Sequence, residues 1–226
     1  MRVLLFGATG MVGRGVLREC LRSPEISRVL VVGRTPTGLA HPKLRELTHP
    51  DLAELMNRPG IEDELSGYDA CFYCLGVSSA GLNPETYQRI THDLTLTVAR
   101  VLADASPGLT FVYVSGQGTD TSERGRSRWA RVKGRTENDL LALPLSTYLF
   151  RPGYIQPLHG ITSRTFLYRA LHSVTTPLFP LIRRLAPDQV TTTEAIGRAM
   201  VSVAATGAPG PYLDNRSING AAARSR

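Results

Sequence analysis

Short apolar runs alternate with helical patterns along this chain of 226 residues. Five of these runs have the character of buried strands in a parallel sheet: residues 2–6, 28–32, 70–75, 109–114 and 145–150. Residues 43–48 alternate polar and apolar positions and form another predicted strand. Apolar residues recur at helical spacing between the strands, and no linker divides the chain. We therefore expect one doubly wound α/β domain over residues 1–226, with a parallel sheet.

The first predicted strand is followed at once by a glycine-rich turn and a helix. Gly7, Gly10 and Gly13 have the spacing G-x-x-G-x-x-G, which indicates a dinucleotide site when it joins a strand to a helix. Gly7 would allow the tight turn, Gly10 would let the backbone approach a pyrophosphate, and Gly13 would let the helix pack closely. Amides at the helix start would hold the phosphates. An ordinary glycine-rich turn is the alternative interpretation.

The end of the second predicted strand bears on the choice of cofactor. Folds that bind NAD place an acidic residue here for the ribose 2′-hydroxyl, whereas those that bind NADP have an arginine near the 2′-phosphate. This chain has Arg34 and no acid at that position, with Arg14 close by in the first predicted helix. The pattern favours NADP over NAD. A solvated loop arginine is the alternative.

The second half of the chain departs from the regular alternation. A helix is predicted over residues 123–143, and another begins at the capping box formed by Thr191 and Glu194. Residues 156–190 mix prolines and histidines with apolar pieces, and we expect them to form a substrate-side cap. Membrane-surface attachment or a subunit contact is the alternative for this segment. Residues 215–226 are small, polar and basic, which predicts a disordered tail.

The charge of the chain narrows the classes of partner. The formal net charge is +7, carried by 24 Arg and 2 Lys against 19 acidic residues. Most arginines are scattered, apart from a cluster in residues 124–135, and no aromatic residues interleave with them. A nucleic-acid partner is therefore not expected. A basic surface around a site for a polyanionic cofactor accounts for the charge.

Cysteine placement and hydropathy suggest a reducing compartment. Cys71 and Cys74 are three residues apart on a predicted strand, so their thiols point to opposite faces and are expected to be buried rather than to share a disulfide or a metal. No apolar run has the length of a membrane span, and the opening run is too short for a signal peptide. We therefore expect a cytoplasmic protein without a metal site.

Several motifs occur together in the predicted strand order. They are the glycine motif at residues 7–13, Val-Gly-Arg34, Tyr-Val-Ser115, Lys133 and Arg151-Pro-Gly. In this combination the chain resembles the short-chain dehydrogenase/reductases. The similar branch is the atypical, NAD(P)H-binding one, with the Tat-interacting tumour-suppressor-like proteins and many bacterial oxidoreductases. The resemblance is specific over residues 1–155 and looser to residue 206. It implies a Rossmann fold with a small C-terminal substrate region.

The same resemblance implies a catalytic Tyr-x-x-x-Lys pair, from which this chain departs. Trp129 stands in the tyrosine position, four residues before Lys133. An indole N–H donates a hydrogen bond but is no general acid or base near neutral pH. Lys133 is expected to contact the nicotinamide ribose, because a compact ammonium fits between two ribose hydroxyls. A solvated helical charge is the alternative for this lysine.

The remaining family positions are matched less closely. Ser115 stands at the end of a strand, but the next two positions, where the family hydroxyl often lies, are Gly116 and Gln117. The helix asparagine that some members use corresponds to Thr91. Tyr154 and His159 are further candidate proton donors besides Ser115.

Together these patterns predict an NADPH-dependent oxidoreductase that delivers hydride to a carbonyl or conjugated double bond of a small-molecule substrate. The alternative is a non-catalytic NADP-binding redox sensor or regulatory protein, which Trp129 favours. A homodimer is one option for the assembly. The predicted catalytic residues are Lys133, Ser115 and Tyr154. The predicted cofactor contacts are Gly7, Thr9, Gly10, Met11, Val12, Gly13, Arg34, Leu75, Gly76, Ser115, Lys133, Pro152 and Ile155.

Overall fold

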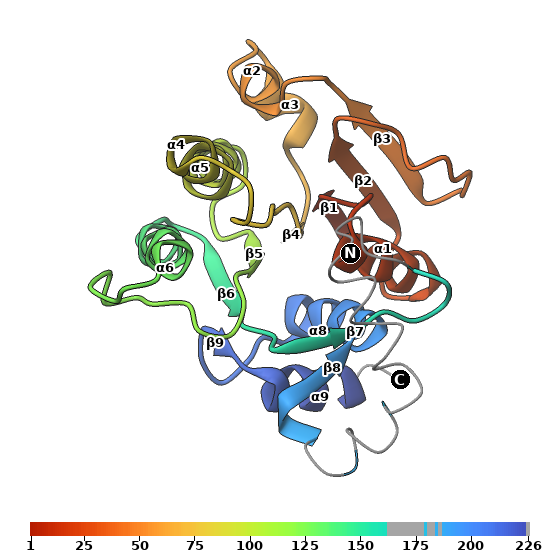
Figure 1. Cartoon of the computed structure of the whole chain (residues 1–226). Helices are drawn as coiled ribbons and strands as arrows, with labels where there is room; N and C mark the ends of the chain where they lie inside the picture. The colour runs from red at the N-terminus through yellow and green to blue at the C-terminus, as the bar shows by residue number, and fades with distance from the viewer. Residues whose placement is uncertain (162–178, 180–183, 185–186, 225–226) are drawn as a thin grey trace.

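A seven-stranded parallel sheet forms the centre of the computed structural model, which describes residues 1–161, 179, 184 and 187–224. The strand order is β3-β2-β1-β4-β5-β6-β9 (Figure 1). These strands are β1 (Arg2–Phe6), β2 (Arg28–Gly33), β3 (Leu44–Thr48), β4 (Ala70–Tyr73), β5 (Thr110–Val114), β6 (Ser146–Phe150) and β9 (Tyr212–Leu213). The order reverses between β1 and β4, which is the point where doubly wound sheets bind ligands. The predicted doubly wound fold is confirmed.

Helices cover both faces of this sheet. They are α1 (Met11–Arg22), α2 (Leu52–Met56), α3 (Ile61–Leu65), α4 (Pro84–Gln88), α5 (Leu94–Ala105), α6 (Arg128–Leu141), α8 (Thr193–Thr206) and α9 (Asn215–Arg224), with a π-helical turn η1 (Arg89–Asp93) and a 3₁₀ turn η2 (Pro187–Gln189). Successive strand residues alternate between two cores, as expected for side chains on a pleated strand.

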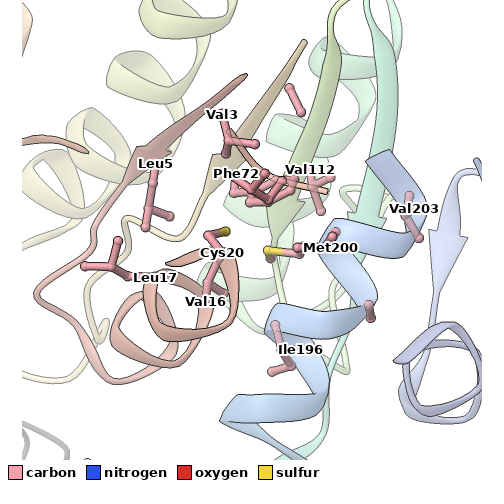
Figure 2. Packing of buried hydrophobic residues seen from close by; sticks show 14 of the residues in the cluster. Val3, Leu5, Val16, Leu17, Cys20, Phe72, Val112, Ile196, Met200 and Val203 are labelled. Carbon is pink, nitrogen blue, oxygen red and sulfur yellow. The ribbon is translucent and has the colours of Figure 1, made fainter. Parts of the chain in front are cut away.

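One core lies between the sheet and helices α1, α8 and α9. Figure 2 shows Val16 of α1 and Met200 of α8 beneath the strand residues Val3 and Phe72. The other core packs α2, α3, α5 and the end of α6 against the opposite face of the sheet. The sheet is therefore buried on both sides, which explains why its central strands are almost entirely apolar.

The two cysteines near β4 lie on opposite faces, as predicted. Cys71 belongs to the core beneath α5, whereas Cys74 packs against the core that contains α1. Both thiols are free, and burial raises their pKa values above the ordinary range. Among the described residues, no group of three or more potential ligands is placed to hold a metal ion. Nor does any helix in this part of the chain have the length and apolar character of a membrane span.

The C-terminal tail is ordered through residue 224, so the prediction of a disordered segment over residues 215–226 is wrong for this part. Residues 215–224 form α9, which packs against α8, and Ile218, Ala221 and Ala222 are buried there. Small alanines at helical spacing bury well against a neighbouring helix although they look featureless in the sequence. Residues 225–226 lie outside the described structure.

Two predicted helix starts are also shifted. Helix α6 begins at Arg128 rather than at residue 123, because the Asp120 carboxylate accepts hydrogen bonds from the Ser122 and Gly125 amides and holds the preceding chain as a loop. The last predicted helix is capped by Thr192, whose hydroxyl accepts the Ala195 amide at 2.9 Å, and not by the expected residue one position earlier.

A small second sheet joins β7 (Tyr154–Gln156) to β8 (Val190–Thr192) in parallel (Figure 1). Thr191 is part of this sheet, where its hydroxyl donates to Asn219 of α9 at 2.8 Å. The predicted substrate-side cap, residues 156–190, lies largely outside the described residues.

Candidate functional site

The glycine turn between β1 and α1 requires glycine at two positions for steric reasons. Gly7 has a φ of +79°, and a Cβ on it would come within 2.6 Å of the Cys74 backbone. A Cβ on Gly13 would overlap the Gly7 carbonyl and come within 2.9 Å of the Ala8 Cα. The tight turn and the close helix–strand packing predicted for these glycines are therefore present.

Gly10 differs from its two neighbours in the motif. It precedes α1 as the N-cap residue, and a Cβ on it would meet only the Gly7 carbonyl oxygen, at 3.3 Å. No side chain caps this helix, and its first turn contains no acidic residue. The first amides of a helix have no intrahelical acceptor, so Met11 and Val12 begin an electropositive helix end. Thr9 lies in the turn just before it and is half-buried.

The end of β2 presents a cationic side chain. Arg34 follows Gly33 directly and is exposed, as is Arg14 in the first turn of α1. Neither forms an ion pair with another described residue. The Gly33 carbonyl accepts the His49 amide at 3.0 Å, which continues the pairing of β2 and β3 beyond the strands. No acidic residue takes the position after β2.

The loops after β4 and β5 lie at the same carboxyl edge of the sheet. Leu75 packs against the core beneath α5, and a Cβ on Gly76 would meet nothing within 4 Å. Ser115 is buried, and its hydroxyl donates to the Phe150 carbonyl at 3.2 Å. The structure thus places the predicted catalytic hydroxyl of Ser115 in a contact between β5 and β6.

Lys133 reaches the same strand end from α6. Its Nζ donates a hydrogen bond to the Ser115 carbonyl oxygen. Burial lowers the pKa of Lys133 to about 8, and the nearby Glu137 carboxylate opposes that shift. A lysine with this pKa is mostly protonated at neutral pH and titrates just above it.

Trp129 lies one helical turn before Lys133, as its position in the motif predicts. Its ring packs on the loop after β5, where a Cβ on Gly118 would come within 3.3 Å of it. Gly118 has a φ of +84°, so glycine is favoured there on both counts. The half-buried indole therefore forms a wall of the site beside Lys133.

The loop after β6 joins this arrangement. The Pro152 carbonyl accepts the Gln117 amide at 2.9 Å and so ties the loops after β5 and β6 together. Ile155 packs against the core that contains α1. The Tyr154 hydroxyl donates to Gln156 Oε1 at 2.8 Å, within β7. Tyr154 is thus already engaged in a hydrogen bond.

His159 lies elsewhere and is not a candidate proton donor at this site. Its Nε2 contacts the Glu194 carboxylate at 2.6 Å, at the start of α8. These two residues line a cavity of about 430 Å³ with Arg18, Arg22 and Arg198, between α1 and α8. The sequence alone did not show that the chain leaves the carboxyl edge of the sheet before it reaches His159.

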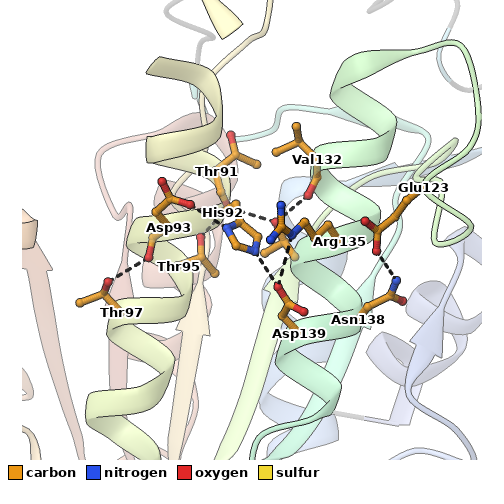
Figure 3. A network of polar contacts seen from close by, with 11 residues as sticks. Thr91, His92, Asp93, Thr95, Thr97, Glu123, Val132, Arg135, Asn138 and Asp139 are labelled. Carbon is orange, nitrogen blue, oxygen red and sulfur yellow. Dashed lines mark hydrogen bonds and ion pairs between the residues drawn. The ribbon is translucent and has the colours of Figure 1, made fainter. Parts of the chain in front are cut away.

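Sequence reasoning missed the polar network that joins η1 to α6 (Figure 3). His92 contacts Asp93 through Nδ1 and Asp139 through Nε2, each at 2.7 Å. Each ring nitrogen therefore faces a carboxylate, one on η1 and one on α6. The preceding Thr91 is buried, and its hydroxyl has no hydrogen-bond partner among the described residues. This turn fixes α6, and with it Lys133, against α5.

A second missed feature is the buried ion pair of Glu137 and Arg151. The carboxylate lies on α6 and the guanidinium directly after β6. The signals available in the sequence were an acidic residue four positions after Lys133 and the Arg-Pro-Gly motif. Neither shows by itself that the two side chains meet.

Comparison with solved structures agrees with this fold. The NAD+ complex of the Bordetella bronchiseptica enzyme WbmF superposes with a TM-score of 0.67 at 17% identity, covering 99% of this chain and 76% of that chain. MoeE5 in complex with UDP-glucose and NAD gives a TM-score of 0.65 at 19% identity, covering 99% of this chain and 81% of that chain. At these identities the likeness concerns the fold alone.

A sequence relative carries a location in its name. Protein fmp52, mitochondrial, from Aspergillus clavatus is 30% identical over 165 residues, which cover 68% of this chain and 66% of the relative. The match thus spans just under two thirds of that relative's length. Further fungal relatives are also named mitochondrial. The expectation of a cytoplasmic location is therefore contradicted.

The family assignment rests on the region that contains the glycine turn. The profile of the NAD dependent epimerase/dehydratase family matches residues 3–123, from β1 to the loop after β5. That match covers more than half of the chain and agrees with the predicted resemblance to short-chain dehydrogenase/reductases. The chain belongs to the NAD-dependent epimerase/dehydratase family and is an NAD(P)-binding Rossmann protein.

Proposed function

We propose that this protein is an NADPH-binding oxidoreductase of the atypical short-chain dehydrogenase/reductase type. The observation that carries the proposal is the geometry at Gly10. The start of α1 has free amides, no acidic residue and no capping side chain, and a Cβ on Gly10 would meet only the Gly7 carbonyl oxygen. A pyrophosphate fits such a site because it needs close backbone approach and a positive helix end.

The preference for NADPH over NADH rests on Arg34. This side chain is exposed at the end of β2, without an ion-pair partner among the described residues, where NAD-binding folds place an acid. Arg14 offers a second cation in the first turn of α1. WbmF and MoeE5 were solved with NAD+ and NAD respectively, so the preference of this chain for NADPH would rest on Arg34 alone.

Lys133 and Trp129 would border the reacting end of the cofactor. When bound, NADPH supplies a hydride to a carbonyl carbon or a conjugated double bond. Lys133 would bind the nicotinamide ribose from its place at the end of β5, and the Trp129 ring would exclude water beside it. Reduction of a carbonyl also consumes one proton and yields an alcohol, so a proton source is needed.

The side chains near the site differ in whether they could supply that proton. Trp129 cannot supply a proton, the Ser115 hydroxyl already donates to Phe150, and the Tyr154 hydroxyl donates to Gln156. The Lys133 ammonium or solvent would have to provide it. These contacts favour a second candidate function, a protein that binds NADP and reports its redox state without turnover.

One experiment separates the two candidates. Purified protein is titrated with NADPH in a calorimeter and then assayed for NADPH oxidation with aldehydes, quinones and enones. Turnover supports the enzyme, and tight binding without turnover supports the sensor. Absence of NADPH binding contradicts both. Light scattering of the same sample tests whether the protein is a homodimer, the option that the sequence left open.

A further inference from the structure

The Glu137 carboxylate is wholly buried, with 0% of its side chain exposed. Burial of an isolated charge is costly, so a buried carboxylate needs close partners. Arg151 provides them: its Nε donates to Glu137 Oε1 at 3.0 Å, and one terminal nitrogen donates to Oε2. This two-pronged contact fixes both the position and the orientation of the carboxylate.

Arg151 is itself held in place from the other side. Its backbone amide donates to the Leu213 carbonyl at 2.8 Å, and its guanidinium lies 4.5 Å from the centre of the Tyr212 ring. Both contacts come from β9. Arg151 therefore ties Glu137, and with it α6, to the β6–β9 edge of the sheet.

The anchored carboxylate lies one helical turn after Lys133, on the side of α6 that also presents Trp129. Glu137 favours the charged form of the Lys133 amine, and its charge contributes to raising the pKa of Tyr113 on β5. Glu137 on the same helix is thus the charged group that acts on the lysine, and Arg151 after β6 holds that carboxylate. Burial, acting alone, would leave the amine more readily neutral.

We propose that Glu137, clamped by Arg151, is a positioning residue that keeps the Lys133 amine charged and directed to the end of β5. This inference rests on the proposed function, since it assigns to Lys133 the contact with the cofactor ribose. Glu137 touches neither cofactor nor substrate and acts through the lysine.

The two-lysine composition of the chain makes a direct test practical. With ¹³Cε-labelled lysine, the full-length protein gives only two side-chain signals, from Lys133 and Lys43. The pH titration of each signal is followed by NMR. In the natural protein the Lys133 signal should titrate near pH 8. In Glu137→Gln its midpoint should fall by about one pH unit or more, because a neighbouring opposite charge is lost. The Lys43 midpoint should not move and is the internal control.

Substitution of Arg151 should shift the Lys133 midpoint in the opposite direction. Arg151→Gln removes a competing cation and leaves the carboxylate to Lys133, so the Lys133 midpoint should rise. Arg151→Lys keeps the charge and is the matched control, with a midpoint near that of the natural protein. Circular dichroism verifies that each variant is folded. If Glu137→Gln does not fold, the Lys133 midpoint in Arg151→Gln decides whether the proposal stands. A purely structural ion pair would give equal midpoints in all folded variants, and that result overturns the proposal.

NADPH titrations across the same pH range separate this inference from the proposed function. Affinity of the natural protein should decline as pH rises through the Lys133 midpoint, and in Glu137→Gln the decline should begin at lower pH by the same interval. Lysine shifts without NADPH binding would support the positioning role and overturn the proposed function. Unchanged lysine midpoints with intact NADPH binding would overturn the positioning role alone.

Discussion

The β1–α1 turn and the start of α6 are both proposed to contact the dinucleotide cofactor. The turn would do so through its backbone and α6 through its side chains. At the turn, backbone geometry makes the site: Gly7 and Gly13 are required by sterics, and Gly10 leaves space. At α6, side chains make it: the half-buried Lys133 donates to a carbonyl, and Trp129 stands in the position of the family tyrosine. The proposed phosphate-binding end therefore depends on backbone geometry that the fold requires. The reacting end depends on side chains that can change while the fold persists.

The largest effect should come from a change that breaks the backbone site by sterics. Gly13→Ala forces a methyl group into the Gly7 carbonyl and Ala8, and neither is a flexible side chain. We expect a loss of more than about 3 kcal/mol in unfolding free energy, at or above the upper range for overpacking. Urea denaturation measures it. Gly10→Ala is the matched control and should stay within about 1 kcal/mol, since its Cβ meets one atom at 3.3 Å. Equal losses for both variants would contradict the distinction between the two glycines.

Arg34→Ala should weaken the binding of NADPH and leave the binding of NADH almost unchanged. Loss of a charge-assisted contact to a phosphate costs about 1.5–3 kcal/mol, so NADPH affinity should drop about tenfold or more. NADH affinity should barely change, because NADH has a hydroxyl in that place. Calorimetric titration with both cofactors checks this. A matched loss for NADPH and NADH would mean that Arg34 does not read the 2′-phosphate.

Trp129→Tyr tests the side-chain half of the site. The variant places a tyrosine hydroxyl four residues before Lys133, where the family's proton donor stands. General acid catalysis contributes roughly 10²–10⁴-fold, so an imperfectly placed tyrosine should raise NADPH oxidation modestly, by about tenfold. Stopped-flow or steady-state assays with quinones and aldehydes measure the rate of NADPH oxidation. If turnover stays the same while NADPH still binds, a missing acid is not what limits the site.

The sequence predicted the backbone-made features better than the side-chain contacts. Periodicity found β1, β2, β4, β5 and β6 because each is buried on both faces and its apolar run is continuous, and it found the edge strand β3 by its polar–apolar alternation. It missed β9, which has only two residues, and α9, whose buried face consists of alanines and Ile218. The cap position was misassigned by one residue because Thr191 and Thr192 are chemically equivalent in sequence. Only their hydroxyl partners separate them: Thr191 donates to Asn219 of α9, whereas Thr192 accepts the Ala195 amide.

Side-chain partners could not be read from spacing. Ser115 was expected to offer its hydroxyl to the site, but the neighbouring strand supplies an acceptor, Phe150. Glu137 and Arg151 are fourteen residues apart and meet only because α6 packs beside the end of β6. His159 was expected near the nicotinamide and instead pairs with Glu194. Each of these contacts depends on a tertiary arrangement that local patterns do not encode.

The central claim is that the turn around Gly10 holds a pyrophosphate, and calorimetric titration of Gly10→Val with NADPH tests it most directly. A branched side chain at this position would occupy the space left for the phosphates without entering the core, because a Cβ there meets only the Gly7 carbonyl oxygen. The account predicts a variant that is folded by circular dichroism and shows no measurable NADPH or NADH binding. A folded variant that binds NADPH with the affinity of the natural protein would contradict it.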